Sequence, residues 1–185
     1  MVSDIYTEKN GIAGILSEVE KIGNFCGLQH AHTDKLRLLA EEMLGLTVRL
    51  FSGIEYEFFV ESKGNTFTLN LKVDTFVNGE QKEKMLSLSS SGKNEAAKGF
   101  FGKITDVFET LVLNDATYDQ GLVPYYDSMG LISFFSFTEY QDEMNTHAKQ
   151  EQWDELEKSI IASIAKDVVI GVRNNKVEMI VTAEF

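Results

Sequence analysis

The sequence predicts an α+β protein, a two-layer sandwich in which an antiparallel sheet of about four or more strands carries helices on one face. Three observations lead to this prediction. Apolar residues first recur at helical spacing, then alternate with polar residues along two adjacent segments, and alternate again in a closing hairpin. With no internal repeat and no Pro-rich linker, residues 1–185 are expected to form a single domain.

Two helices are expected near the start of the chain. Residues 11–25 place apolar side chains at steps of three and four, and this helix should end near Gly27. Thr33 suits the N-cap of the second helix, with Asp34 in the first turn. The expected buried stripe of this second helix consists of Leu36, Leu39, Met43, Leu46 and Leu50.

Alternation then predicts two strands at residues 54–62 and 65–74, joined by a turn at Gly64. A closing hairpin is expected from residues 168–173 and 176–184. We expect these four strands to share one sheet whose inner face meets the helix that carries Leu39, Met43 and Leu46.

The middle of the chain is expected to hold a loop at residues 85–93 and a helix at 94–111. Residues 114–130 lack a clear period and contain Pro124, so this segment is predicted to be mostly loop. Ser136 and Glu139 fit a capping box that begins a short helix. Apolar spacing around Ile160 marks another helix, and the aromatic residues Phe134, Phe135, Phe137 and Tyr140 are expected in the core.

Charge and cysteine content narrow the class of protein. The formal net charge is −12 and there is no basic run, which disfavours nucleic acid and anionic membrane surfaces as partners. No stretch is long and apolar enough to span a bilayer, and the first ten residues lack the apolar core of a signal peptide. The single cysteine, Cys26, is expected to be a buried structural thiol, and the protein is expected to be cytoplasmic.

Residues 36–108 combine three elements: the helix sequence LRLLAEEMLGL at 36–46, two strands that end at Asp74, and a glycine-containing loop that enters a helix. This order resembles the histidine-kinase-like (GHKL, Bergerat-fold) ATPases, and is most similar in length to the single-domain anti-sigma-factor serine kinases. The resemblance implies a signalling protein that binds ATP or ADP and acts on a protein partner.

The resemblance assigns roles to individual residues. Glu42 matches the catalytic glutamate that orients the attacking group, but Leu46 stands where the family has an asparagine that holds Mg²⁺. Asp74 matches the aspartate that binds the adenine amino group, but the alternate glycines that the family has after it are absent, and Phe76 would crowd the base. The phosphate loop is represented by Ser91, Gly92, Lys93 and Asn94.

Structural roles are the alternatives at each position. Glu42 can be part of a solvated helix edge, Asp74 can cap a strand or turn, and residues 91–94 can be an ordinary helix cap. His30, His32 and Asp34 are better explained as a polar helix connection than as metal ligands.

Three functions therefore remain open. One is a regulatory protein that binds an adenine nucleotide with little dependence on Mg²⁺ and negligible phosphotransfer, because Leu46 supplies no oxygen ligand. The second is a non-catalytic protein-interaction module that kept the fold and lost ATP binding. The third is an unrelated small-molecule-binding protein of the same architecture. The sequence does not define the oligomeric state.

Overall fold

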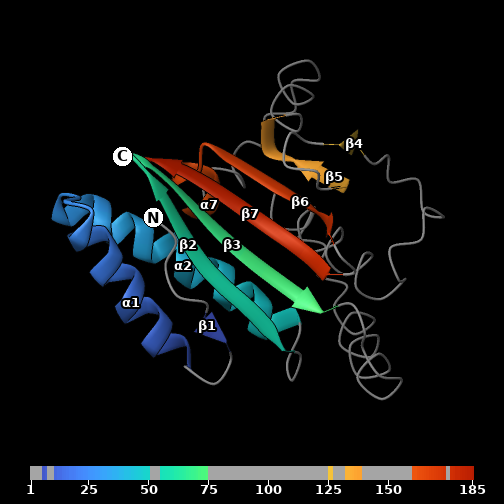
Figure 1. Ribbon diagram of the computed structural model, residues 1–185, viewed down its shortest axis with the longest axis horizontal. Helices are drawn as coiled ribbons and strands as arrows, with labels where there is room; N and C mark the ends of the chain where they lie inside the picture. The colour runs from blue at the N-terminus through green and yellow to red at the C-terminus, as the bar shows by residue number, and fades with distance from the viewer. Residues whose placement is uncertain are drawn as a thin grey trace, which may run out of the picture.

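The computed structural model describes residues 6–7, 11–50, 55–74, 125–126, 132–138, 160–173 and 176–185. In these ranges an open antiparallel sheet carries the helices on one face (Figure 1). The predicted α+β class and two-layer arrangement are confirmed. The expected loop at 85–93 and helix at 94–111 lie outside the described residues.

Helix α1 spans Gly11–Phe25 and ends as the sequence predicts. The Leu28 N–H donates to the Gly23 carbonyl and the Gly27 N–H donates to the Asn24 carbonyl, each at 3.0 Å. Gly27 has a φ of 78°, the left-handed conformation that glycine adopts without a steric penalty. Together these features form a Schellman motif, which turns the chain toward the second helix.

Helix α2 spans His30–Leu50, so the prediction that Thr33 caps it is wrong. The Gln29 carbonyl accepts hydrogen bonds from the N–H groups of His32 and Thr33 at 2.9 and 3.0 Å, which places the helix start before Thr33. Thr33 is only 3% exposed, and its side chain faces Gly23 of α1. Packing between the two helices therefore determines the role of this threonine.

The sheet has the strand order β1-β2-β3-β7-β6-β5-β4, and neighbouring strands are antiparallel. Its longer strands are β2 (Tyr56–Lys63), β3 (Thr66–Asp74), β6 (Asp167–Arg173) and β7 (Lys176–Glu184). Strand β7 pairs with both β3 and β6, which confirms that the closing hairpin belongs to the same sheet.

Among the described residues, three shorter strands extend the sheet beyond those that the sequence predicts. They are β1 (Tyr6–Thr7), β4 (Tyr125–Tyr126) and β5 (Ile132–Ser136). Within the segment 114–130, predicted as mostly loop, Tyr125 and Tyr126 form β4, and a strand of two residues is too short to show alternation. The other residues of this segment lie outside the described residues. Phe137 and Thr138 are helical directly after Ser136, in agreement with the helix start predicted there.

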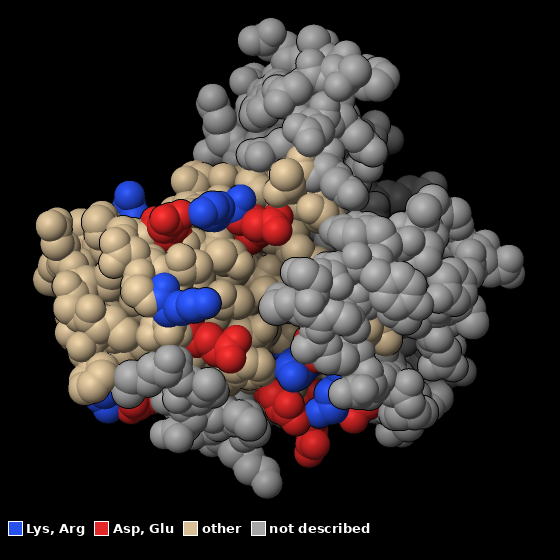
Figure 2. Space-filling view, turned by 45° about the horizontal axis from the view of Figure 1, so that its top comes forward, with Lys and Arg blue, Asp and Glu red and all other residues tan. Residues whose placement is uncertain are grey.

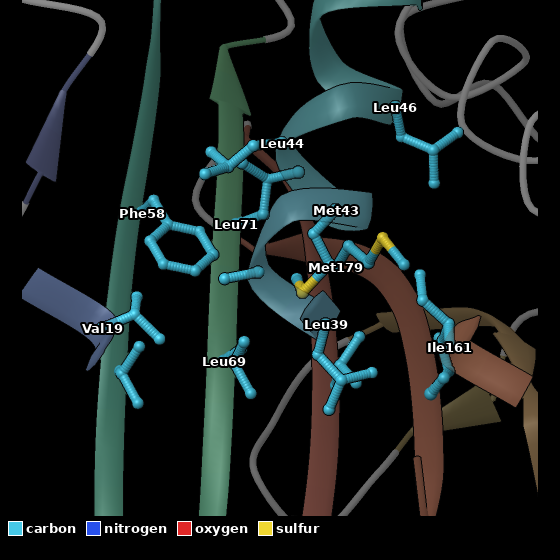
Figure 3. Packing of buried hydrophobic residues seen from close by; sticks show 14 of the residues in the cluster. Val19, Leu39, Met43, Leu44, Leu46, Phe58, Leu69, Leu71, Ile161 and Met179 are labelled. Atoms are coloured by element: carbon cyan, nitrogen blue, oxygen red, sulfur yellow. The ribbon is translucent and has the colours of Figure 1, made fainter. Parts of the chain in front are cut away.

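The hydrophobic core lies between the inner face of the sheet and the helices. Leu39 and Met43 of α2 point toward Phe58, Leu69, Leu71 and Met179 of the strands, and Figure 3 shows these side chains in one layer. Helix α7 (Ile160–Ile164) adds the fully buried Ile161 to the same layer. The predicted contact between the stripe of α2 and the inner face is confirmed, and Phe137 is buried as expected.

The close approach of α1 and α2 at Gly23 gives a testable prediction. A Cβ atom at position 23 would lie 3.0 Å from Thr33 Cγ2, closer than ordinary van der Waals contact. This contact opposes the gain of about 1 kcal/mol that alanine normally brings over glycine in a helix interior, so Gly23→Ala should lower the free energy of unfolding by about 0–2 kcal/mol in urea denaturation. In a Thr33→Ala background the same change should cost much less, and strictly additive effects would contradict this packing.

Candidate functional site

Glu42, the candidate catalytic residue, lies on the α2 side that faces α7. Its Oε2 accepts a hydrogen bond of 2.8 Å from the backbone N–H of Ile161, which is 119 residues away in the sequence. Ile161 lies in the first turn of α7, where backbone N–H groups have no partner within the helix. The Glu42 carboxylate therefore acts as an N-terminal cap supplied by another helix, with favourable charge toward the α7 dipole.

Leu46 occupies the position at which the resemblance would require a metal ligand. It is 4% exposed and belongs to the hydrophobic core with Leu39 and Met43. Its hydrocarbon side chain has no oxygen to offer Mg²⁺. Position 46 therefore holds an apolar core side chain. The carboxylate of Glu42, one helical turn earlier, already accepts a hydrogen bond from Ile161.

Asp74, the candidate adenine ligand, is the last residue of β3, as the sequence predicts. It is half-buried and lies opposite Lys176 of β7 in the strand register. The negative charge of Asp74 is one of the causes that raise the pKa of Lys176. The remaining candidates, Ser91, Gly92, Lys93 and Asn94, lie outside the described residues, so the anion site predicted there stays a prediction.

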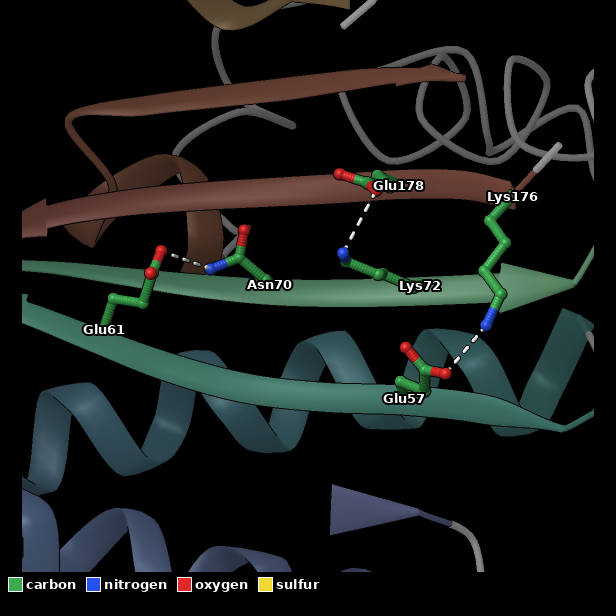
Figure 4. A network of polar contacts seen from close by, with 6 residues as sticks. All are labelled: Glu57, Glu61, Asn70, Lys72, Lys176 and Glu178. Carbon is green, nitrogen blue, oxygen red and sulfur yellow. Dashed lines mark hydrogen bonds and ion pairs between the residues drawn. The ribbon is translucent and has the colours of Figure 1, made fainter. Parts of the chain in front are cut away.

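A second group of polar residues lies on the sheet face opposite the helices. We call it the outer-face cluster, and Figure 4 shows its six members on the three adjacent strands β2, β3 and β7. Alternation along each strand places these side chains on one face. The members are Glu57, Glu61, Asn70, Lys72, Lys176 and Glu178.

Charges alternate across the strands of this cluster. Glu57, Lys72 and Glu178 are direct neighbours in the register of β2, β3 and β7. Lys72 Nζ lies 3.3 Å from Glu178 Oε1 and 5.1 Å from the centre of the Phe59 ring. Because the Glu178 side chain is 4% exposed and that of Lys72 is 23% exposed, this ion pair is much less screened by solvent than an ordinary surface pair.

Lys176 connects β7 with β2 across the intervening strand β3. Its Nζ donates a hydrogen bond of 2.7 Å to Glu57 Oε1 (Figure 4). This bond is the largest cause of a raised pKa for Lys176; burial opposes it, and the negative charges of Glu57, Asp74 and Glu178 add to it. In the outer-face cluster each lysine therefore pairs with one carboxylate, Lys72 with Glu178 and Lys176 with Glu57. The third carboxylate, Glu61, accepts a contact of 3.5 Å from the Asn70 side-chain amide.

The sequence shows the alternating charges of the outer-face cluster but not their partners. Local pattern gives no pairing between β2 and β7, which meet only through β3. On the described surface seen in Figure 2, basic and acidic side chains lie side by side and do not form a patch of one sign.

The histidines near the start of α2 and Cys26 do not form a common site. His30 Nδ1 lies 2.8 Å from Asp34 Oδ2, whereas His32 stacks on Phe185 with ring centres 5.4 Å apart. In the described ranges no three His, Cys, Asp or Glu side chains are grouped in a way that could hold a metal ion. The prediction that Cys26 is buried is wrong: it follows the end of α1, is exposed, and its Sγ lies 3.5 Å from Ser62 Oγ.

Comparisons with known proteins add no family to this description. No family model, no curated protein and no solved structure matches the chain. Among the helices that the structure describes, none combines the length and the apolar character needed to cross a bilayer.

The role of Glu42 as a cap can be tested by substitution. Glu42→Ala removes the acceptor of the Ile161 N–H and should lower the free energy of unfolding by about 1–3 kcal/mol. Glu42→Gln keeps an acceptor oxygen and should recover part of this loss. Glu41→Ala, an exposed neighbour whose partner is Arg37 at 3.5 Å, is the matched control and should change stability by less than about 0.5 kcal/mol. Equal effects of Glu41→Ala and Glu42→Ala in urea denaturation would contradict the capping role.

The raised pKa of Lys176 predicts a pH dependence at alkaline pH. The folded state holds this proton more tightly than the unfolded state, so the stabilisation is complete below the ordinary lysine pKa and disappears as pH rises through the raised value. At pH 8, Lys176→Gln should therefore be less stable than the wild type by about 0.2–1 kcal/mol, a typical range for partly exposed pairs.

The difference between Lys176→Gln and the wild type should shrink toward pH 11 in urea denaturation. Lys35→Gln, which changes the net charge equally at an exposed position of α2, is the control for the general effect of charge. A difference that stays constant or grows with pH after this correction would show that the ion pair with Glu57 does not contribute to stability.

Proposed function

We propose that this chain is a non-catalytic regulatory protein of the cytoplasm that acts by binding a protein partner and does not transfer phosphoryl groups. One observation carries the proposal: the two positions that the resemblance assigns to phosphotransfer, 42 and 46, serve in helix capping and in core packing. Glu42 holds the Ile161 N–H at 2.8 Å, and Leu46 lies in the core.

Chemistry makes this use significant. A glutamate that orients an attacking group needs a carboxylate oxygen directed at the substrate, and phosphoryl transfer also needs a metal ion to neutralise charge on the phosphate oxygens. Oε2 of Glu42 is directed at a backbone N–H of α7. The residues that are described near α2 therefore do not fit Mg²⁺ bound in the manner of the ATPases that the sequence resembles.

A second candidate function is binding of an adenine nucleotide, ATP or ADP, without a contribution from Mg²⁺. Its support is the place of Asp74, a half-buried carboxylate at the end of β3 that can accept a hydrogen bond from an exocyclic amino group. Any such site has to compete with Lys176, whose charge lies opposite Asp74 in the sheet. This candidate function agrees with the resemblance to the ATPases but includes no phosphotransfer.

Nucleotide binding is tested by thermal unfolding of the full chain with ATP or ADP, each in Mg²⁺ and in excess EDTA. If Asp74 holds adenine, both nucleotides should stabilise the protein equally in the two conditions, by about 2.7 kcal/mol at 100 times the Kd. Asp74→Asn should abolish the shift, and Glu61→Gln is a matched control at an exposed carboxylate on the outer sheet face. No shift with either nucleotide would reject this second candidate and leave the first one intact.

The absence of phosphotransfer is tested by phosphate release from ATP and by serine phosphorylation in the presence of Mg²⁺. We expect the wild type and Glu42→Gln to give the same background signal. Turnover that depends on Mg²⁺ and is lost in Glu42→Gln would contradict the first proposal.

Partner binding is tested by reciprocal purification, in EDTA, from cells that express the chain. A protein that co-purifies with the chain, and with which the chain co-purifies in turn, supports the proposal. A chain that is recovered as a monomer without any other protein counts against it.

A further inference from the structure

We draw no further inference here: the strongest candidate, the outer-face cluster on β2, β3 and β7, carries nothing because its lysines already pair with its carboxylates and nothing in the described part of the chain shows what covers the buried Glu178.

Discussion

The inner face of the four long strands has to be shielded from water, and the apolar stripe of α2 is the main element that shields it. Phe58, Leu69, Leu71 and Met179 present a continuous apolar surface on neighbouring strands. Burial of one such side chain contributes about 1.5–3 kcal/mol, so the rotation of α2 about its own axis is tightly constrained. A rotated helix would expose its stripe and uncover the sheet.

This constraint decides what each side of α2 can do. Positions 39, 43 and 46 follow one another at four and three residues, so the rotation that buries Leu39 and Met43 also buries position 46. An asparagine there would place an amide in an apolar layer at a substantial cost. Glu42 lies at the edge of the same stripe, where it reaches the start of α7. Packing of α2 against the sheet thus gives Leu46 a role in the core and Glu42 a role as the cap of α7.

Much of the fold could be predicted from the sequence because its main elements have strong local periods. The helix at Gly11–Phe25 and the alternation in β3 and β7 follow directly from the spacing of apolar residues. The local preference of a residue gave a wrong prediction where a tertiary contact determined its position. Thr33 is a good N-cap residue, but it packs against Gly23 inside the helix hairpin, and Gln29 precedes the helix instead.

The candidate site was predictable only in part, because its partners are distant in sequence. The position of Asp74 at a strand end follows from alternation, but its place opposite Lys176 depends on the pairing of β3 with β7. The bond from Ile161 to Glu42 joins residues 119 positions apart, and no local pattern indicates such a contact. The predicted burial of Cys26 is wrong because α1 ends at Phe25, one residue before it, and leaves Cys26 exposed.

Hydrogen exchange at the Ile161 amide measures most directly whether the Glu42 carboxylate is committed to α7. In Glu42→Ala this amide should exchange about 5–150 times faster than in the wild type, the rate change that corresponds to loss of about 1–3 kcal/mol of local stability. The Val181 amide of the central strand β7 serves as the internal reference for global unfolding, and Glu41→Ala is the control variant. Unchanged Ile161 exchange in Glu42→Ala would show that Glu42 does not hold α7 and would return it to the list of candidate catalytic residues.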